Sequence, residues 1–385
     1  MSRPLRAEER VILVAHPGAE LYGSDRVMLE TVEALREDGR RVVVALPVDG
    51  PLVAQLQKLG ADVRICRMPV TRKSALRPRG FVRYLGDTAA GIRDGRRVIK
   101  EVRPELIYVS TLTIPLWFVL ARAARIPSIC HVHEAERSSS RLVRTALALP
   151  LLLADKVVAN SRFSVDVLAS AFSRLGSTEV LYNGVTGPRS RRPARLDLAG
   201  RLGVVYVGRL SPRKGVDVAV SAVESLRAEG RDVSLDLVGS VFPGYEWYES
   251  ELRGQVDRAG LGASIRFHGF KNKVWDEIAD SDVLVVPSRV DEPFGNTAVE
   301  GILSGRPVVA SATSGLLEAV ADYPSTRTVA PGDPRALADA LRDVADGWQE
   351  RRENAWTDAG EAERRHSTSR YRDRIRAIVH DLEAA

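Results

Sequence analysis

Residues 204–215 read VVYVGRLSPRKG, and this stretch decides the fold that we expect. The apolar run 204–207 predicts a buried strand, the glycine, proline and basic residues after it predict a loop, and 215–229 has the apolar periodicity of a helix. Further strands at 234–238 and 283–287 alternate with helical segments in the same way. Such alternation is typical of a parallel sheet that helices cover on both faces.

The same alternation occupies the first half of the chain, where apolar runs of strand length recur from 11–15 to 179–182. Between the halves, 183–200 is dense in glycine, proline and arginine. A chain of 385 residues is long enough for two domains. The sequence therefore predicts an α/β fold of two doubly wound, Rossmann-like domains that face each other across a cleft. The expected parts are an N-terminal domain at 1–185, a linker at 186–200, a C-terminal domain at 201–360 and a charged helix at 361–385 that ties the domains together.

The composition argues against several classes of protein. No apolar run reaches the roughly 18 residues that span a bilayer, and the N-terminus lacks the pattern of a signal peptide, so we expect a cytoplasmic protein. Cys66 and Cys130 stand outside any CxxC or Cys/His cluster, which argues against disulfides and zinc sites. The GxGxxG signature of dinucleotide-binding oxidoreductases and the GxxxxGKS/T signature of P-loop NTPases do not occur.

The net charge is +6, and the segment 72–103 is especially basic. Its basic residues are interleaved with apolar and aromatic ones, which is compatible with contact to an anionic membrane surface at the inner face of the cell membrane. A solvated pair of arginine-rich helices explains the pattern equally well. Nucleic acid is not expected as a partner, because no nucleic-acid-binding module accompanies the charge. The basic residues are Arg72, Lys73, Arg77, Arg79, Arg83, Arg93, Arg96, Arg97, Lys100 and Arg103.

Arg209 and Lys214 lie within the single loop that follows 204–207. Gly208 lets the chain turn sharply, so that a guanidinium and an ammonium group can converge on a diphosphate. At about 4 Å and an effective dielectric constant near 20, one such contact is worth roughly 4 kcal/mol before desolvation. Two cations could therefore stabilise a departing nucleoside diphosphate without a metal ion. An exposed basic turn with a solvated lysine is the alternative.

A second loop, 287–300, contains two glutamates on either side of a Gly-Asn turn. Glu292 precedes this turn, and Glu300 lies in the helix that the turn is predicted to open. The amides and positive dipole end of a helix start suit phosphate or sugar oxygens. Carboxylates accept hydrogen bonds from sugar hydroxyls. For Glu300 an alternative stays open, because Thr297-x-x-Glu300 is also the pattern of a capping box.

Together these loops resemble the retaining, family 4 type (glycosyltransferase group 1) of GT-B glycosyltransferases. The resemblance is carried by Gly208-Arg209 to Lys214-Gly215, by Glu292-x7-Glu300, and by GRPVVAS at 305–311 and PGDP at 331–334. It implies an acceptor-side N-terminal domain and a donor-binding C-terminal domain. In the family's pattern Arg209 and Lys214 hold the donor diphosphate, Glu300 the ribose and Glu292 the transferred sugar. It also implies donor contacts from Gly208, Gly239, Gly269, Phe270, Phe294, Gly295, Asn296 and Thr297.

The N-terminal half resembles the family less closely. Residues 16–24 (HPGAELYGS) look like its glycine loop, with Gly23 near the donor phosphate, although one glycine stands where many members have two. HVHE at 131–134 resembles the histidine-bearing loop that faces the donor sugar. His133 is the predicted site residue because alternation along a strand points it away from Val132, although His131 shares that face. A buried core histidine and, for the HxH pattern, a metal site are the alternatives.

The resemblance implies a metal-independent hexosyltransferase with retained anomeric configuration. It would move a sugar from a UDP- or GDP-sugar to a glycan, glycolipid, lipid-linked or small-molecule acceptor in polysaccharide or glycoconjugate biosynthesis. No cofactor is expected, since the nucleotide sugar is a substrate. A nucleotide-sugar epimerase or hydrolase and a nucleotide-sugar-binding protein without catalysis are the alternatives on the same fold. The predicted catalytic residues are His133, Arg209, Lys214 and Glu292.

Overall fold

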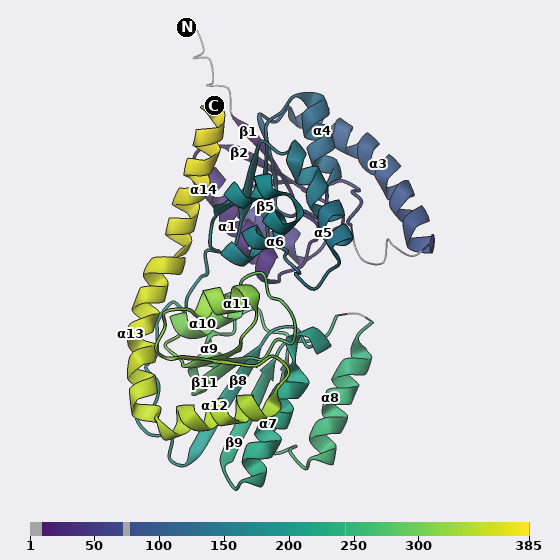
Figure 1. Cartoon of the computed structure of the whole chain (residues 1–385). Helices are drawn as coiled ribbons and strands as arrows, with labels where there is room; N and C mark the ends of the chain where they lie inside the picture. The colour runs from purple at the N-terminus through teal and green to yellow at the C-terminus, as the bar shows by residue number, and fades with distance from the viewer. Residues whose placement is uncertain (1–9, 72–77, 243, 385) are drawn as a thin grey trace. The chain divides into compact units, whose positions relative to one another are not determined.

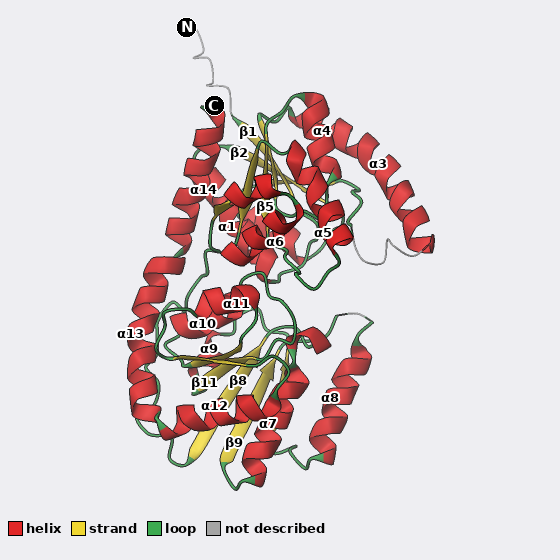
Figure 2. Cartoon of the chain, in the orientation of Figure 1, coloured by secondary structure: helices red, strands yellow, loops and turns green. Residues whose placement is uncertain are grey.

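The computed structural model describes residues 10–71, 78–242 and 244–384, which form two compact units (Figure 1). The first unit runs to Gly184 and takes up the chain again at Thr368, and the second spans Val185–Ser367. Each unit contains one parallel sheet with helices along it (Figure 2). The predicted α/β class with two doubly wound sheets is confirmed.

In the first unit the described strands form one sheet in the order β3-β2-β1-β4-β5-β6-β7, and each pair is parallel. The strands are β1 (Val11–Ala15), β2 (Arg41–Leu46), β3 (Asp62–Ile65), β4 (Leu106–Val109), β5 (Ser128–Val132), β6 (Lys156–Ala159) and β7 (Glu179–Val180). The helices are α1 (Gly23–Glu37), α2 (Pro51–Lys58), α3 (Pro78–Val102), α4 (Leu116–Ala124), α5 (Arg141–Ala148), the 3-10 helix η2 (Leu149–Leu153), α6 (Arg162–Ala171), the 3-10 helix η3 (Ser173–Ser177) and α14 (Thr368–Glu383).

Helices cover both faces of this sheet at β1. Consecutive strand residues point to opposite sides, so alternate residues of β1 face different helices. Ile12 and Val14 of β1 pack with residues of α1, α2 and α14. Leu13 and Ala15 pack with residues of α3, α4 and α6. The strand is therefore apolar throughout, as expected for a parallel sheet that is covered on each face.

In the second unit the described strands pair in the order β10-β9-β8-β11-β12-β13, again all parallel. The strands are β8 (Arg201–Val207), β9 (Asp232–Val238), β10 (Ile265–Gly269), β11 (Val283–Val286), β12 (Val308–Ser311) and β13 (Thr326–Val329). The helices are the 3-10 helix η4 (Pro212–Lys214), α7 (Val216–Ala228), α8 (Glu246–Arg258), α9 (Trp275–Ala279), α10 (Asn296–Leu303), α11 (Ser314–Val320), α12 (Pro334–Asp346) and α13 (Trp348–His366).

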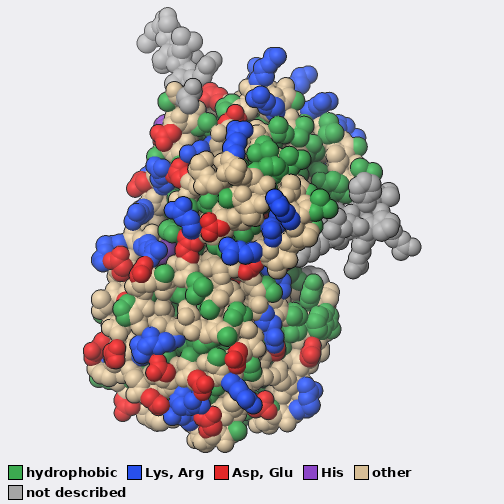
Figure 3. All heavy atoms as spheres, in the orientation of Figure 1, with side chains coloured by type: hydrophobic (Ala, Val, Ile, Leu, Met, Phe, Trp, Pro, Cys, Tyr) green, Lys and Arg blue, Asp and Glu red, His purple; other side chains and the backbone are tan. Residues whose placement is uncertain are grey.

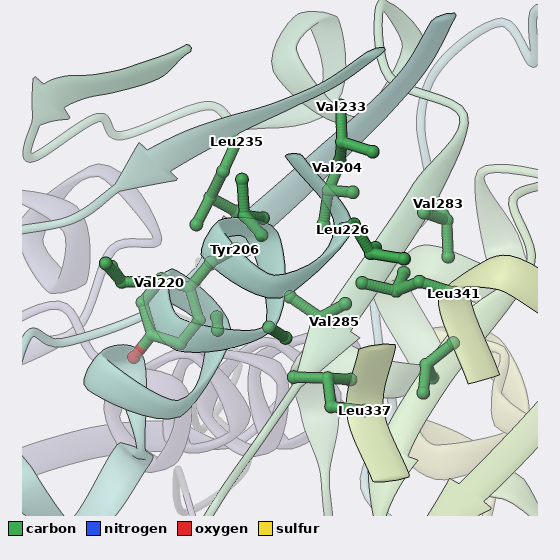
Figure 4. Packing of buried hydrophobic residues seen from close by; sticks show 14 of the residues in the cluster. Val204, Tyr206, Val220, Leu226, Val233, Leu235, Val283, Val285, Leu337 and Leu341 are labelled. Carbon is green, nitrogen blue, oxygen red and sulfur yellow. The ribbon is translucent and has the colours of Figure 1, made fainter. Parts of the chain in front are cut away.

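The core of the second unit includes the inward side chains of β8, β9 and β11 together with α7 and α12. Figure 4 shows Leu226 of α7 and Leu337 of α12 close to Val285 of β11. Full burial of each such side chain contributes roughly 1.5–3 kcal/mol relative to exposure. Tyr206 belongs to the same cluster, and its hydroxyl donates to the carbonyl of Arg209 (2.6 Å). The end of β8 is thus tied to the loop that follows it.

Residues 186–200, expected as a linker, belong to the second unit. Arg195 donates to both carboxylate oxygens of Asp282 (2.7 and 2.6 Å). The buried guanidinium of Arg306 donates to five backbone carbonyls, among them that of Arg192 within this segment (3.0 Å). Burial lowers the pKa of Arg306 to about 10. The buried N–H donors of Arg306 are thus satisfied by carbonyls. Together with the Arg195–Asp282 pair, the hydrogen bond to Arg192 holds the segment 186–200 on the second unit.

The C-terminal segment 361–385, expected as one helix, is divided between two helices. Helix α13 ends at His366 and α14 begins at Thr368. Ser367 between them has φ −59° and ψ 142°, outside the helical region, so the helix cannot continue through it. Helix α14 packs against α1 in the first unit.

Part of the basic segment 72–103 can be placed. Arg72, Lys73 and Arg77 lie outside the described residues, as do the side chains of Arg79 and Arg83. The remainder of the segment lies on α3 and directly after it. In the part of the chain that the structure describes, no helix is both long and apolar enough to cross a membrane.

Candidate functional site

Each sheet has a point at which the strand order reverses. In the first unit it lies between β1 and β4, and in the second between β8 and β11. Open α/β sheets bind ligands beyond the carboxyl ends of their strands at such a switch point. Most of the predicted site residues lie near one of these two points.

Three predicted glycines stand at the carboxyl ends of β8, β9 and β10, which are neighbours in the sheet. The amide of Gly208 donates to the carbonyl of Val238 (2.9 Å), and the amide of Gly239 donates to that of Gly269 (2.8 Å). Gly239 has φ +147°, and a Cβ built there would lie 1.8 Å from the carbonyl oxygen of Gly208. Only glycine allows this approach, which brings the loops after β8 and β9 together.

Lys214 and Glu292 make a polar contact across the β8–β11 switch point. Lys214 Nζ donates to Glu292 Oε1 (2.6 Å), and Ser288 Oγ donates to the same oxygen (2.7 Å). Gly215 brings the two loops together, since with φ +65° its added Cβ would lie 2.0 Å from the carbonyl oxygen of Pro287. The side chains of Lys214 and Glu292 are 36% and 17% exposed, so this ion pair stays within reach of a ligand.

Arg209 leaves the end of β8 and lies on an aromatic ring. Its guanidinium carbon is 3.2 Å from the ring centroid of Phe242, in the loop after β9. The ring face attracts the cation. This contact restricts the orientation of the planar guanidinium and therefore the directions of its N–H donors. Phe270, which follows Gly269 at the end of β10, is 49% exposed, so its ring is accessible.

Helix α10, which carries Glu300, begins earlier than a capping box would require. It starts at Asn296 with Gly295 as its N-cap, so Thr297 lies inside the first turn. The capping-box interpretation of Thr297 and Glu300 is therefore wrong. Gly295 has φ +151°, and a Cβ there would lie 2.7 Å from Leu316 Cδ1, which explains the glycine.

In the segment that leads into α10, one side chain is buried in the core, and the backbone amides at the start of the helix are the groups suited to a ligand. Phe294 is buried, and its ring lies 5.6 Å from that of His366 on α13. The side chain of Phe294 therefore packs within the unit, and only its main chain could serve a ligand. Asn296 and Thr297 supply the first-turn amides of α10, the kind of group that binds anions at helix starts.

In the first unit, a buried cluster of His16, Asp25 and Ser110 joins the ends of β1 and β4. His16 Nδ1 lies 2.5 Å from Ser110 Oγ, and His16 Nε2 lies 2.7 Å from Asp25 Oδ1. Asp25 Oδ2 accepts the amide of Tyr22 (2.7 Å), directly before α1. The predicted Gly23 is the first residue of α1 and is exposed. The loop 16–24 is thus held by side chains at its start and at its end.

The two histidines of the HVHE segment differ in their surroundings. His131 is fully buried, and its Nδ1 lies 2.7 Å from the hydroxyl of Tyr108. His133 follows the end of β5 and is partly exposed, with its ring 4.1 Å from that of His131. Burial, with a smaller contribution from His16, lowers the pKa of His133 to about 3, and burial lowers that of His131 well below its ordinary value. Both imidazoles are therefore neutral near pH 7.

The buried network reaches the C-terminal helix. The hydroxyl of Tyr371 on α14 lies 2.6 Å from Thr31 Oγ1 on α1, and the Tyr371 ring stacks on His131 at a centroid distance of 6.2 Å. The core-histidine alternative therefore describes His131. His133 is the one of the pair that a ligand can reach.

His16, Asp25 and Ser110 were not among the predicted site residues. The local signal was a histidine directly after the first strand and an aspartate in the first turn of the next helix. Ser110 is 94 residues away from His16 along the chain, so only the fold brings it into contact. Among the described residues, no group of three or more His, Cys, Asp or Glu side chains is arranged to hold a metal ion.

Both halves of the chain match known protein families. Residues 194–362 match the family described as "Glycosyl transferases group 1", and residues 22–186 match "Glycosyltransferase Family 4". The chain belongs to the group 1, family 4 glycosyltransferases. The two matches lie in the two halves of the chain, with the boundary between 186 and 194.

Two relatives from Mycobacterium tuberculosis illustrate the breadth of the family. A glycogen synthase is 29% identical over 275 residues, which cover 67% of this chain and 65% of the relative. A GDP-mannose-dependent alpha-(1-6)-phosphatidylinositol dimannoside mannosyltransferase is 28% identical over 276 residues, covering 65% of this chain and 67% of that protein. The match spans less than two thirds of the length of the glycogen synthase.

A solved structure shows the same fold. The crystal structure of Anabaena Alr3699/HepE in complex with UDP-glucose superposes with a TM-score of 0.82 and 23% identity. The match covers 96% of this chain and 99% of HepE. The chain therefore has the GT-B fold.

Proposed function

We propose that this chain is a retaining hexosyltransferase that moves a sugar from a UDP- or GDP-sugar to an acceptor hydroxyl. The observation that carries the proposal is the Lys214–Glu292 contact across the β8–β11 switch point. It joins a cation suited to a diphosphate and a carboxylate suited to sugar hydroxyls, where doubly wound sheets bind ligands. Because both groups are partly exposed, a nucleotide sugar could contact them without unfolding the loops.

Each residue has a distinct proposed task. Arg209 and Lys214 contact the diphosphate, and the first turn of α10 adds amide donors. Glu292 accepts hydrogen bonds from the transferred sugar, because Ser288 and Lys214 both contact Oε1 and Oε2 keeps lone pairs for a hydroxyl. Glu300 accepts from the ribose hydroxyls. His133, held neutral by burial, exchanges a hydrogen bond with a sugar hydroxyl.

In the proposed reaction, the acceptor oxygen forms a bond to the anomeric carbon as the bond from that carbon to the diphosphate oxygen breaks. Attack and departure occur on the same face of the sugar, and the acceptor proton passes to the departing phosphate oxygen. Negative charge develops on the diphosphate, so Arg209 and Lys214 stabilise the transition state more than the ground state. We propose that these two cations act without a metal ion.

The names of two relatives support the proposed donors. HepE was solved with UDP-glucose, and the mannosyltransferase is named for GDP-mannose. A UDP- or GDP-hexose is therefore the proposed donor class. A glycan or lipid-linked acceptor is proposed because that mannosyltransferase acts on a phosphatidylinositol dimannoside and the segment 72–103 is basic. This segment would contact an anionic membrane surface.

Calorimetric titration of UDP, GDP and ADP into the purified protein, without added metal, tests the donor site. One diphosphate should bind selectively, and Lys214→Ala should weaken it by about 10- to 100-fold, as expected for one charge-assisted contact. Arg213→Ala is the matched control, because Arg213 is the exposed neighbour in the same 3-10 helix. An equal loss in both variants would indicate general charge rather than a specific contact.

Product analysis then tests the reaction. A transferase releases the nucleoside diphosphate only with an acceptor and links the sugar to it with the donor's anomeric configuration. A nucleotide sugar returned without any acceptor would indicate an epimerase, and donor cleavage by water alone would indicate a hydrolase. If no diphosphate binds, with or without magnesium, the assignment of the loops after β8 and β11 fails.

A further inference from the structure

An apolar stripe faces solvent along α5 and η2 in the first unit. Leu142 is 80% exposed, Leu149 is 55% exposed and Leu153 is 40% exposed. Ala146 is exposed as well. The spacing 142, 146 and 149 follows α-helical periodicity, so these three side chains share one side of α5 and its C-cap, and Leu153 is exposed at the end of η2.

This stripe is not the core-facing side of the segment. Ala148 and Leu151, on other positions, are buried in the cluster that covers one face of the first sheet. A surface helix usually turns its apolar side to the core and a polar side to water. Here the exposed positions after Arg141 are apolar as well. Contiguous exposed apolar surface of this kind marks an interaction site.

Neighbouring helices extend the same surface. Helix α4 contacts η2 and α3, and α5 contacts η2. Val119 on α4 and Leu85 on α3 are also exposed. Figure 3 shows hydrophobic side chains gathered on the part of the first unit where Figure 1 labels α4 and α5, with Lys and Arg side chains around them.

The charge of these helices has one sign. Helices α4, α5 and η2 contain Arg122, Arg141 and Arg144 and no acidic residue. Arg144 donates to the backbone carbonyls of Arg137 (2.6 Å) and Ser139 (2.8 Å). These contacts hold its guanidinium in place without cancelling its charge.

We infer that the stripe Leu142, Ala146, Leu149 and Leu153 docks on an anionic lipid surface. Exposed leucines on helices whose charged residues are all arginines match a bilayer interface, where apolar groups enter the acyl boundary and cations meet the headgroups. A second copy of the chain fits less well, because an isologous contact would oppose identical sets of arginines. The inference rests on the membrane-bound acceptor in the proposed function and names a surface outside the segment 72–103.

Co-sedimentation with lipid vesicles tests the inference. The full chain should bind vesicles of equal parts phosphatidylcholine and phosphatidylglycerol and should bind phosphatidylcholine alone much more weakly. The double variant Leu142→Ser, Leu149→Ser should lose at least about tenfold in partitioning, because two leucines no longer insert. Leu196→Ser is the matched control, since Leu196 is 75% exposed in the second unit, and it should bind like the unchanged chain.

Three results would overturn the inference: no binding by the unchanged chain, equal binding to both vesicle types, or a double variant that binds as well as the control. A fourth result would come from sedimentation velocity: if the unchanged chain and the control form a dimer and the double variant does not, the stripe is a contact between two copies of the chain. Nucleoside diphosphate titration of the same variants separates the two proposals. Retained diphosphate affinity with lost vesicle binding isolates the membrane surface, whereas failure of the donor site would remove diphosphate affinity from every variant.

Discussion

The two sheets of this chain place a polar contact at the same topological point but build it from different chemistry. In the first unit His16 and Ser110 join the ends of β1 and β4 at 2.5 Å, and both are buried. In the second, Lys214 and Glu292 join the loops after β8 and β11 at 2.6 Å, and both are partly exposed. Topology thus sets where a site lies, whereas the strand-end residues set what it can bind.

The charge of the two strand-end regions differs as well. The first edge comprises the carboxyl ends of β1, β4 and β5, and the second edge comprises the carboxyl ends of β8 and β11. Burial keeps His131 and His133 neutral near pH 7, so His133, the one that a ligand can reach, can exchange a hydrogen bond with a sugar hydroxyl but cannot neutralise a diphosphate. The second edge carries Arg209 and Lys214 in partly exposed loops, where an anion can reach them. We therefore expect substitutions at the first edge to act mainly on stability and those at the second mainly on donor binding.

The largest effect is expected from Gly239→Ala in the second unit. The new Cβ would overlap the carbonyl oxygen of Gly208 and would require alanine to adopt φ +147°. We expect the unfolding free energy to fall by about 3 kcal/mol or more, with loss of diphosphate binding. Urea unfolding followed by fluorescence, together with calorimetry, measures both.

Gly262→Ala is the control for this backbone effect. No atom lies within 4 Å of a Cβ added there, so the change should stay within about 0.5 kcal/mol. Equal destabilisation by the two alanines would break the explanation that close approach of the β8 and β9 loops requires glycine at position 239.

The next effect compares the two switch points directly. Asp25→Ala leaves His16 Nε2 and the Tyr22 amide without their buried acceptor, so it should cost about 2–3 kcal/mol of stability. Lys214→Ala removes a partly exposed ion pair and should cost less than about 1 kcal/mol. Denaturant unfolding of both variants at one pH measures the difference. Comparable costs would mean that the Lys214–Glu292 pair is structural, like the first cluster.

The last effect concerns the pH dependence of stability. Unfolded histidine binds a proton near pH 6.5, whereas folded His133 does so only near pH 3, so its contribution to stability is lost as pH falls between these values. His133→Gln should reduce the loss of unfolding free energy between about pH 7 and about pH 5 by about 1–2 kcal/mol. An unchanged pH dependence would show that burial does not disfavour the charged form of His133.

Much of the fold followed from local patterns. Apolar runs marked most strands, and the loops that hold Arg209, Lys214 and Glu292 were predicted from residues adjacent in sequence. Strand β13 was not predicted, because its segment 326–329 reads TRTV and has only one buried position. The division between α13 and α14 was also missed, since it depends on one extended residue, Ser367.

The sequence alone determined that two parallel sheets form and that a basic loop and an acidic loop follow β8 and β11, because each of these features is encoded within a few neighbouring residues. Tertiary structure decided which side chains meet. It brought Lys214 to Glu292 across 78 residues and His16 to Ser110 across 94. It also buried His131, left His133 accessible, and placed Thr297 inside α10 instead of at its cap. Contacts over such separations depend on strand order and packing, which no local pattern records.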